Sequence, residues 1–270
     1  MDRNFKSLEK SRLEMDKSEI LYGIHPVFEA VRAGRRKVYE IYIAKQKDST
    51  LLRNISKLAE PAKIPLISVK PDHLTKITGS DFQQNIAAKV SEYPLIAFED
   101  ILNSITQKNY DFLLLLDTVV DPQNLGALAR TALCAGVSGI VITKDRSASP
   151  TPAVSKASAG ALEHIFLSKV TNMVSSIKEM KDRGIWVVGM DAMADMPVFS
   201  CDLKGPIALV IGSEGKGIRQ LVKANCDFLV SIPQKGEVSS LNASAAGAVA
   251  MYEVFRQRNF TGRLSNSEIR

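Results

Sequence analysis

The sequence has few of the residues that bind metal ions or form disulfides. Three cysteines and three histidines occur among 270 residues. Cys134, Cys201 and Cys226 lie far apart, and no pair of Cys or His has the spacing of a zinc site. We therefore expect three buried, unpaired thiols and no metal site.

Long hydrophobic runs are also missing. The longest are the strand-sized segments 112–116 and 207–211, far shorter than the ~18 residues of a membrane span. The N-terminal residues mix both charge signs and lack the apolar centre of a secretory signal. These absences predict a cytoplasmic protein without a membrane anchor.

What is present fits a soluble protein with a polyanionic partner. Hydrophobic residues make up 45% of the chain, charged residues 24%, and the net charge is +6, as in soluble globular proteins. A chain of 270 residues predicts two domains. Its basic residues cluster near the N-terminus, where they favour an RNA-binding patch that contacts phosphates, with a solvated charged face as the alternative. The cluster comprises Arg32, Arg35, Arg36, Lys37, Lys45 and Lys47, and the first four are the predicted RNA-binding residues.

The first third of the chain predicts a small α/β domain over residues 20–93. Residues 1–19 are polar with mixed charges, which is typical of a flexible arm. No catalytic set of residues lies in this domain, so we expect it to bind a substrate and not to transform it. Residues 94–109 are predicted as a linker. Hydrophobic periodicity predicts helices over 26–33 and 51–60 and strands over 38–44, 65–69 and 86–90.

The remainder predicts a second α/β domain over 110–260, followed by a tail at 261–270. Its strands are apolar along their whole length, which is typical of parallel sheets covered on both faces. In such sheets ligands bind beyond the carboxyl ends of the strands. The predicted strands are 112–116, 139–143, 185–189, 207–211 and 228–232, and the predicted helices are 125–135, 152–162, 172–183 and a closing alanine-rich helix.

Asn124 and Arg130 follow the first of these strands. Pro122 interrupts the chain before a helix, so Asn124 either caps that helix or faces the cleft at its start. Arg130 lies in a helix otherwise made of Leu, Ala, Thr and Cys. An arginine in such surroundings needs a carboxylate or a phosphate as its partner.

Three glycines occur within six residues, from Gly212 to Gly217, after the strand 207–211. The segment is not a Walker A loop, because the leading glycine is absent and Gly217 stands where Ser or Thr should follow the lysine. Glycines at this density let the backbone approach a ligand closely, with a plain turn as the alternative. Glu214 between them is expected to pair with Arg130.

Ser239, Ser240, Asn242 and Ser244 stand at the start of the closing helix. One such residue would serve as a cap, but four within six positions predict that some of them face a ligand. No nucleophile in the three segments stands beside a histidine base. The segments therefore suit the binding of a phosphate and the orientation of a hydroxyl, with the reactive group left to a cofactor.

The three segments closely resemble the SpoU (TrmH-type) family of RNA ribose 2'-O-methyltransferases in the SPOUT superfamily. The resemblance covers residues 110–258. Lys144-Asp-Arg-Ser-Ala and Phe255-Arg-Gln-Arg are most similar to the branch that methylates a guanosine of 23S ribosomal RNA. Residues 21–91, which open with Tyr22-Gly-Ile-His-Pro, resemble the RNA-binding domain of that branch. The motifs are Asp121-Pro-Gln-Asn-Leu-Gly-Ala with Arg130, Ala208-Leu-Val-Ile-Gly-Ser-Glu-Gly-Lys-Gly, and Ile232-Pro with Ser239-Ser-Leu-Asn-Ala-Ser.

The resemblance implies an α/β fold with a mostly parallel sheet and a C-terminal trefoil knot, preceded by a small RNA-binding domain like a ribosomal protein. It also implies a homodimer whose partner is RNA, either 23S rRNA or an assembling large ribosomal subunit. The implied cofactor is S-adenosylmethionine, held by Gly189, Gly212, Ile232 and Leu241. The implied catalytic centre consists of Asn124, Arg130, Glu214, Ser240, Asn242 and Ser244.

In such an enzyme the ribose 2'-hydroxyl attacks the methyl group of the cofactor. A guanidinium holds its proton too tightly to be a good base, so we expect Arg130 to clamp a phosphate and to stabilise the developing alkoxide, oriented by Glu214. Within the family, the alternatives are a tRNA ribose methyltransferase and a resistance-type methyltransferase of a ribosomal adenosine. Outside it, they are a non-catalytic RNA-binding assembly factor and a nucleotide-phosphate enzyme built on the Gly212 loop.

Overall fold

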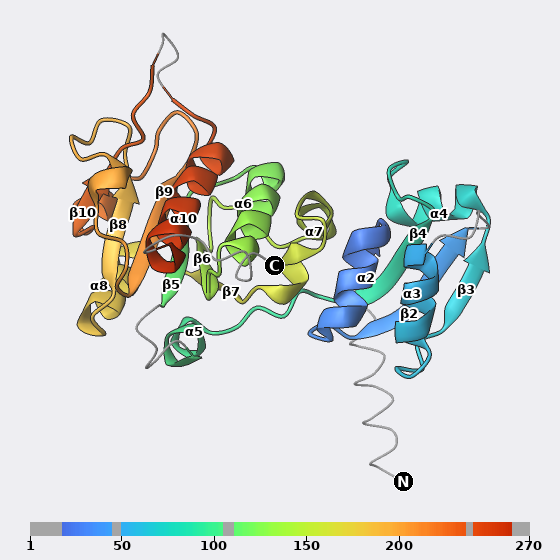
Figure 1. Cartoon of the computed structure of the whole chain (residues 1–270). Coiled ribbons are helices and arrows are strands. Elements are labelled where there is room, and N and C mark those ends of the chain that lie inside the picture. Colours follow the sequence, from blue (N-terminus) through green and yellow to red (C-terminus); the bar gives the residue numbers. More distant parts are fainter. Residues whose placement is uncertain (1–17, 45–49, 105–110, 236–239, 261–270) are drawn as a thin grey trace. The chain divides into compact units, whose positions relative to one another are not determined.

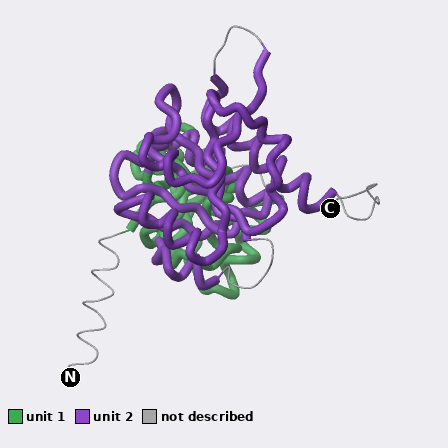
Figure 2. The backbone as a smooth tube through the Cα atoms, turned by 90° about the vertical axis from the view of Figure 1, so that its left-hand side faces the viewer, with its two compact units in different colours: residues 1–94, 149–164 green, residues 95–148, 165–270 purple. Residues whose placement is uncertain are grey.

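The computed structural model describes residues 18–44, 50–104, 111–235 and 240–260. They form two compact units (Figure 2). The first comprises the chain up to Pro94 together with Ser149–His164, and the second comprises Leu95–Ala148 and the chain from Ile165 onward. The predicted domains are continuous, so the place of 149–164 in the first unit is a feature that periodicity does not predict. The predicted arm, apart from its last two residues, and the predicted tail lie outside the described residues.

The first unit is built on a four-stranded sheet with helices on both faces (Figure 1). Helices α2 (Ile24–Ala33) and α3 (Thr50–Ala59) pack on one face, where Leu21, Ile41 and Ile55 are fully buried. Helix α4 (Pro71–Thr78) packs on the other face through Leu74. Strands β2 and β3 are parallel and the other pairs are antiparallel. The strand order is β1 (Ser18–Tyr22), β4 (Ile86–Ser91), β2 (Val38–Ala44), β3 (Leu66–Val69).

The second unit contains a six-stranded sheet in which all neighbouring strands are parallel. The central strand, β5, is buried along its whole length because helices cover both faces of the sheet. This confirms the predicted α/β class with a parallel sheet. The order is β10 (Phe228–Val230), β8 (Trp186–Met190), β9 (Ile207–Gly212), β5 (Phe112–Asp117), β6 (Gly139–Thr143), β7 (Leu167–Val170).

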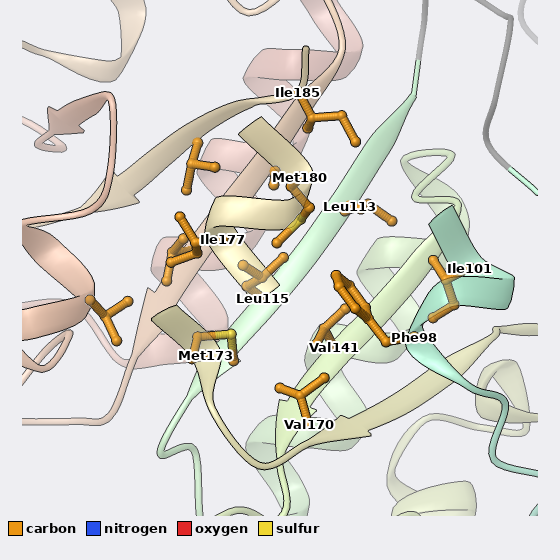
Figure 3. Packing of buried hydrophobic residues seen from close by; sticks show 14 of the residues in the cluster. Phe98, Ile101, Leu113, Leu115, Val141, Val170, Met173, Ile177, Met180 and Ile185 are labelled. Carbon is orange, nitrogen blue, oxygen red and sulfur yellow. The ribbon is translucent and has the colours of Figure 1, made fainter. Parts of the chain in front are cut away.

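Helices α5 (Phe98–Ser104) and α8 (Met173–Asp182) cover one face of this sheet. Figure 3 shows Met173, Ile177 and Met180 of α8 packed in one cluster with Leu113 and Leu115 of β5. On the other face, α6 (Pro122–Cys134) and α10 (Ala243–Asn259) pack against each other. A Cβ at Gly247 would lie 2.3 Å from Leu128 Cδ2 and 2.7 Å from Ile211 Cδ1. Glycine therefore sets the close approach of α10 to α6 and β9. The short α9 (Gln220–Lys223) follows β9.

Three sequence predictions need correction. Residues 94–109 are not a plain linker, because α5 lies within them and buries Ile101 and Leu102 in the core. The predicted helix 152–162 is broken: α7 (Pro152–Ala157) ends before Ala159 and Gly160, whose φ angles of 52° and 84° interrupt a helix, and a 3-10 turn follows. Cys134 is exposed, because it ends α6 on the solvent side.

Candidate functional site

A cavity of about 460 Å³ opens at the carboxyl ends of β8, β9 and β10. Its walls come from residues 190–193, 212–217, 232 and 234, which follow these strands, and from the start of α10. It therefore lies beyond the carboxyl ends of three strands that are neighbours in the parallel sheet. Ligands of open α/β sheets bind at such a point.

Three of the four predicted cofactor residues, Gly212, Ile232 and Leu241, line this cavity. Gly212 has to be glycine, because a Cβ there would lie 2.0 Å from the carbonyl carbon of Gly217, where the loop folds back on the strand. Gly189 does not line the cavity. A Cβ at Gly189 would lie 2.9 Å from Cys226 Sγ, so its small size serves the packing beneath β8.

Three of the predicted catalytic residues form one hydrogen-bonded cluster at the edge of the cavity. Asn242 Nδ2 donates to Asn124 Oδ1 at 3.0 Å and to Glu214 Oε1. Asn124 Nδ2 donates to the same oxygen of Glu214 at 2.9 Å. The cluster thus joins α6, the glycine-rich loop and the start of α10. Asn124 is buried, whereas Glu214 is exposed and lines the cavity.

The helix caps explain which polar groups are left for a ligand. Asp121, and not Asn124, caps α6, accepting the backbone N–H of Gln123 at 2.9 Å. Asn242 caps α10: its Oδ1 accepts from the backbone N–H of Ser244 at 2.8 Å and of Ala245 at 3.3 Å. Because its amide nitrogen remains free for the cluster, Asn242 serves both as a cap and as a bridge.

The predicted serines of this segment differ in their places. Ser240 is exposed and lines the cavity. The Ser244 hydroxyl donates to Asn242 Oδ1, so it supports the cap. Ser239 lies outside the described residues.

Arg130 does not pair with Glu214, contrary to the prediction. It is exposed on α6 and makes no hydrogen bond or ion pair with the residues that the structure describes. Its side chain leaves the helix about 120° away from that of Asn124, since six residues separate the two positions. Within the single chain, Asn124 and Asn242 are therefore the hydrogen-bond partners of Glu214, where Arg130 was expected.

Two ion pairs at the site were not predicted. Asp117, fully buried at the end of β5, binds the guanidinium and backbone N–H of Arg219, which follows the glycine-rich loop. An acidic residue that ends an otherwise apolar strand is a sequence signal that could have identified it. On the cavity wall, Asp191 pairs with Lys223. Burial acts to raise the pKa of Asp191, but hydrogen bonds from Lys223 and the Met193 N–H, with the charge of Lys223, bring it below its ordinary value.

Two of the four predicted RNA-binding residues in the first unit remain largely accessible to a phosphate. Arg32 is exposed and contacts Glu29 at 3.7 Å. Lys37 is exposed, with its ammonium group 5.1 Å from the centre of the Tyr39 ring.

Arg36 and Arg35 are engaged in packing. The Arg36 guanidinium is buried between Glu163, at 3.0 Å, and Glu19, at 2.6 Å, so the RNA contact predicted for it needs correction. Arg35 is half-buried and its Nη1 lies 3.4 Å both from the Tyr93 hydroxyl and from the Glu163 carbonyl, to which it donates.

Neither a metal site nor a membrane span is found in the described part of the chain. No group of three or more His, Cys, Asp or Glu there could hold a metal ion. None of the helices there is long and apolar enough to cross a membrane.

A parallel sheet covered on both faces, with a glycine-walled cavity and an amide–carboxylate cluster at its carboxyl edge, defines an α/β protein of the cofactor-binding class. The profile of the SpoU rRNA Methylase family matches residues 111–252. A second profile, RNA 2'-O ribose methyltransferase substrate binding, matches residues 20–95. The chain belongs to the SpoU rRNA methylase family.

The similarity to known proteins extends over both units. A TrmH-family protein of Bacillus subtilis is 42% identical over 246 residues, which cover 90% of this chain and 98% of the relative. The 23S rRNA (guanosine-2'-O-)-methyltransferase RlmB of Ralstonia nicotianae is 38% identical over 246 residues, covering 91% and 98%. The crystal structure of the SpoU methyltransferase AviRb from Streptomyces viridochromogenes in complex with AdoMet matches with a TM-score of 0.77 at 25% identity, covering 97% of this chain and 96% of that chain. The resemblance seen in the motifs is confirmed.

Proposed function

We propose that this protein transfers a methyl group from S-adenosylmethionine to the ribose 2'-hydroxyl of a guanosine in 23S ribosomal RNA. The observation that carries the proposal is the cluster of Asn124, Glu214 and Asn242 at the edge of a cofactor-sized cavity. It occurs in a SpoU-family chain whose relatives include enzymes named for this reaction. We also propose that the protein acts in the cytoplasm, where such a substrate would be found.

The cavity suits S-adenosylmethionine in size and in chemistry. Its volume of about 460 Å³ falls within the ~300–1,000 Å³ of small-molecule sites. Ile211, Ile232 and Leu241 offer an apolar surface for a purine, and the loop from Gly212 to Gly217 brings peptide groups close to the ligand. When bound, S-adenosylmethionine supplies an electrophilic methyl group on a positively charged sulfur.

The residues of the chain then have to align the ribose and assist the loss of one proton. Two amide donors hold Glu214 Oε1, which fixes the carboxylate plane at the cavity edge. We assign Glu214 Oε2 as the acceptor that orients the 2'-hydroxyl, with Ser240 beside it on the same wall. Asn124 and Asn242 act through Glu214 as positioning residues.

We propose that the protein is a homodimer in which Arg130 clamps an RNA phosphate. Helices α6 and α10 present Leu133, Val249 and Tyr252 to solvent at 38%, 36% and 49% exposure. Val249 and Tyr252 are three residues apart and share one face of α10, and exposed apolar side chains grouped in this way mark interfaces. Arg130 is directed away from its own Glu214, so a second subunit would give its guanidinium a place to act.

Mixing two inactive variants tests whether Arg130 acts across the interface. Arg130→Ala and Glu214→Gln chains would be purified, mixed and allowed to exchange subunits. If Arg130 serves the site of the other subunit, the mixed dimers contain one intact site and regain part of the activity. If Arg130 serves its own site, one site of each mixed dimer lacks Arg130 and the other lacks Glu214. Activity then stays absent.

Two further features are part of the proposal. The first unit is proposed to bind RNA as a ribosomal-protein-like domain, supported by the substrate-binding profile and the exposed Arg32. The second unit is proposed to contain the trefoil knot of the SPOUT superfamily. In support, the segments after β8, β9 and β10 line one cavity. Helix α10 then packs on α6, which follows β5, the strand of this sheet that comes first in the chain.

Two measurements test the proposed function. Titration calorimetry with S-adenosylmethionine should show saturable binding, and its absence would overturn the methyltransferase and favour the assembly-factor alternative. Primer extension at low nucleotide concentration should then locate the ribose that loses its methyl group in a strain lacking the gene. A missing stop at one 23S guanosine is the expected result, whereas a change at an adenosine or in tRNA would favour the other members of the family.

A further inference from the structure

The loop between α4 and β4 buries a glutamine and exposes a phenylalanine. Gln83 is 7% exposed, and its neighbour Phe82 is 80% exposed. Burial of a phenylalanine ring is one of the larger stabilising contributions that a side chain can make. The loop forgoes this contribution, so the exposure of Phe82 calls for a cause outside folding.

Hydrogen bonds hold the loop in this form on both sides of Phe82. Ser80 Oγ accepts from the Phe82 backbone N–H at 3.2 Å, and Gln83 Oε1 accepts from the Asn85 N–H at 2.6 Å. Gln84 and Asn85 have φ angles of 54° and 59°, in the left-handed region that glutamine rarely adopts. Strained backbone that a surrounding network maintains is typical of functional sites.

Gln84 connects the loop to two helices of the same unit. Its Oε1 accepts from the Ile24 backbone N–H at 3.2 Å, at the start of α2, and from Lys156 Nζ at 2.7 Å, on α7. A Cβ at Gly23 would lie 2.4 Å from Lys156 Nζ, so the glycine leaves room for the ammonium group. The ammonium group of Lys156 is therefore held at the side chain of Gln84, which stands two positions after Phe82 in the chain.

We propose that Phe82 is a stacking platform for an unpaired base of the RNA substrate, with Lys156 contacting a neighbouring phosphate. The inference rests on the proposed function, and Phe82 lies within the segment that matches the substrate-binding profile. Proteins that bind unpaired RNA stack its bases on exposed aromatic rings. A pre-formed loop also reduces the entropy lost on binding.

The test uses the full-length protein and a fluorescent single-stranded oligoribonucleotide, with 23S rRNA from a strain lacking the gene as the methylation substrate. Phe82→Ala should raise the Kd for the oligonucleotide about 5- to 100-fold and raise the KM for rRNA. Phe82→Tyr should bind like the wild type. Leu66→Ala removes another exposed apolar side chain of the same unit, 43% exposed, and should change neither value.

A spectroscopic variant tests stacking directly. The chain has a single tryptophan, Trp186, so a Trp186→Phe, Phe82→Trp double variant reports from the loop alone. Its fluorescence should be quenched by the single-stranded oligonucleotide and much less by a duplex of the same length. Unchanged fluorescence with the single strand would overturn the stacking role.

The outcomes separate this inference from the proposed function. If the wild type binds S-adenosylmethionine and methylates rRNA while Phe82→Ala binds the oligonucleotide within twofold of it, the stacking role is overturned and the proposed function stands. If Phe82→Ala is defective only on ribosomal particles, the ring contacts a protein and the inference is again overturned. If the wild type methylates no RNA but Phe82→Ala weakens oligonucleotide binding, the stacking role stands and the proposed function fails.

Discussion

Arg219 binds both carboxylate oxygens of Asp117, one through its backbone N–H and the other through its guanidinium. Its backbone N–H donates to Oδ2 at 2.8 Å, and its Nε and Nη2 lie 2.8 Å and 2.6 Å from Oδ1. Asp117 ends the central strand, and Arg219 lies two residues beyond the loop Gly212–Gly217, at the start of α9. The pair therefore connects the segment after the glycine-rich loop to the end of β5, in the middle of the sheet.

Replacing Arg219 with Gln should lower the free energy of unfolding and weaken the binding of S-adenosylmethionine. Breaking a buried ion pair by removing one partner costs about 3–5 kcal/mol, and the 40% exposure of the Arg219 side chain reduces the expected loss to about 2 kcal/mol. Urea denaturation and titration calorimetry measure the two effects. The control is Arg183→Gln, which removes an exposed ion pair with Glu179 and a hydrogen bond to Asn103 and should cost under about 1 kcal/mol. Equal losses for both variants would contradict the assignment.

Replacing Asn242 with Ser should separate its two roles. Serine caps a helix about as well as asparagine, but its hydroxyl is too short to bridge to Asn124 and Glu214. We expect the stability to change by less than about 1 kcal/mol while kcat/KM falls at least about tenfold, or ~1.4 kcal/mol in transition-state stabilisation. The matched control is Asp121→Ala, which removes only the cap of α6 and should lower stability by about 1 kcal/mol with little change in kcat/KM.

Replacing Gly247 with Ala should destabilise the protein, although alanine is the better helix former. The new Cβ would lie 2.3 Å from Leu128 Cδ2, and such overpacking costs about 1–3 kcal/mol, which exceeds the gain of ~1 kcal/mol in helix propensity. Gly205→Ala adds the same methyl group where no atom lies within 4 Å, and should be neutral or slightly stabilising. Thermal unfolding of both variants distinguishes packing from propensity.

The Asp191–Lys223 pair should make the stability of the second unit depend on pH in the acid range. The pKa of Asp191 is lowered in the folded protein, because the hydrogen bonds and charge of Lys223 outweigh the effect of burial. Its contribution is therefore present above the ordinary aspartate pKa of ~3.9 and is lost as the pH falls through the folded value. The difference in unfolding free energy between the wild type and Asp191→Asn should shrink on acidification below about pH 4. A difference that is constant with pH would contradict this.

The sequence predicts the parts of the fold that local patterns encode. Continuously apolar strands such as 207–211 indicate a parallel sheet, and the structure extends that strand by only one residue, to Gly212. Strand β7 is missed because Leu-Ser-Lys-Val is short and mixed in polarity. Helix α5 is missed because it has only seven residues and lies between polar stretches.

The sequence predicts which residues form the site better than it predicts which of them contact one another. Asn124, Glu214 and Asn242 are each marked by an unusual local context, but their contacts join positions 90 and 118 residues apart. Arg130 is an example of a pairing that the sequence predicts wrongly. Its apolar neighbours in the sequence predict a nearby anion, but the helical period directs its side chain away from Glu214. Similarly, no local pattern reveals that Arg36 meets Glu163 in the core of the first unit.

The place of residues 149–164 in the first unit has a consequence for how the protein can be divided. The chain passes from one unit to the other after Pro94, after Ala148 and after His164. A fragment ending at Pro94 would lack Glu163 and leave the buried charge of Arg36 with Glu19 alone. The two units are therefore not separable modules in series. Exchange of the RNA-binding unit between relatives, by recombination or by design, will preserve the fold only when both of its segments are transferred together.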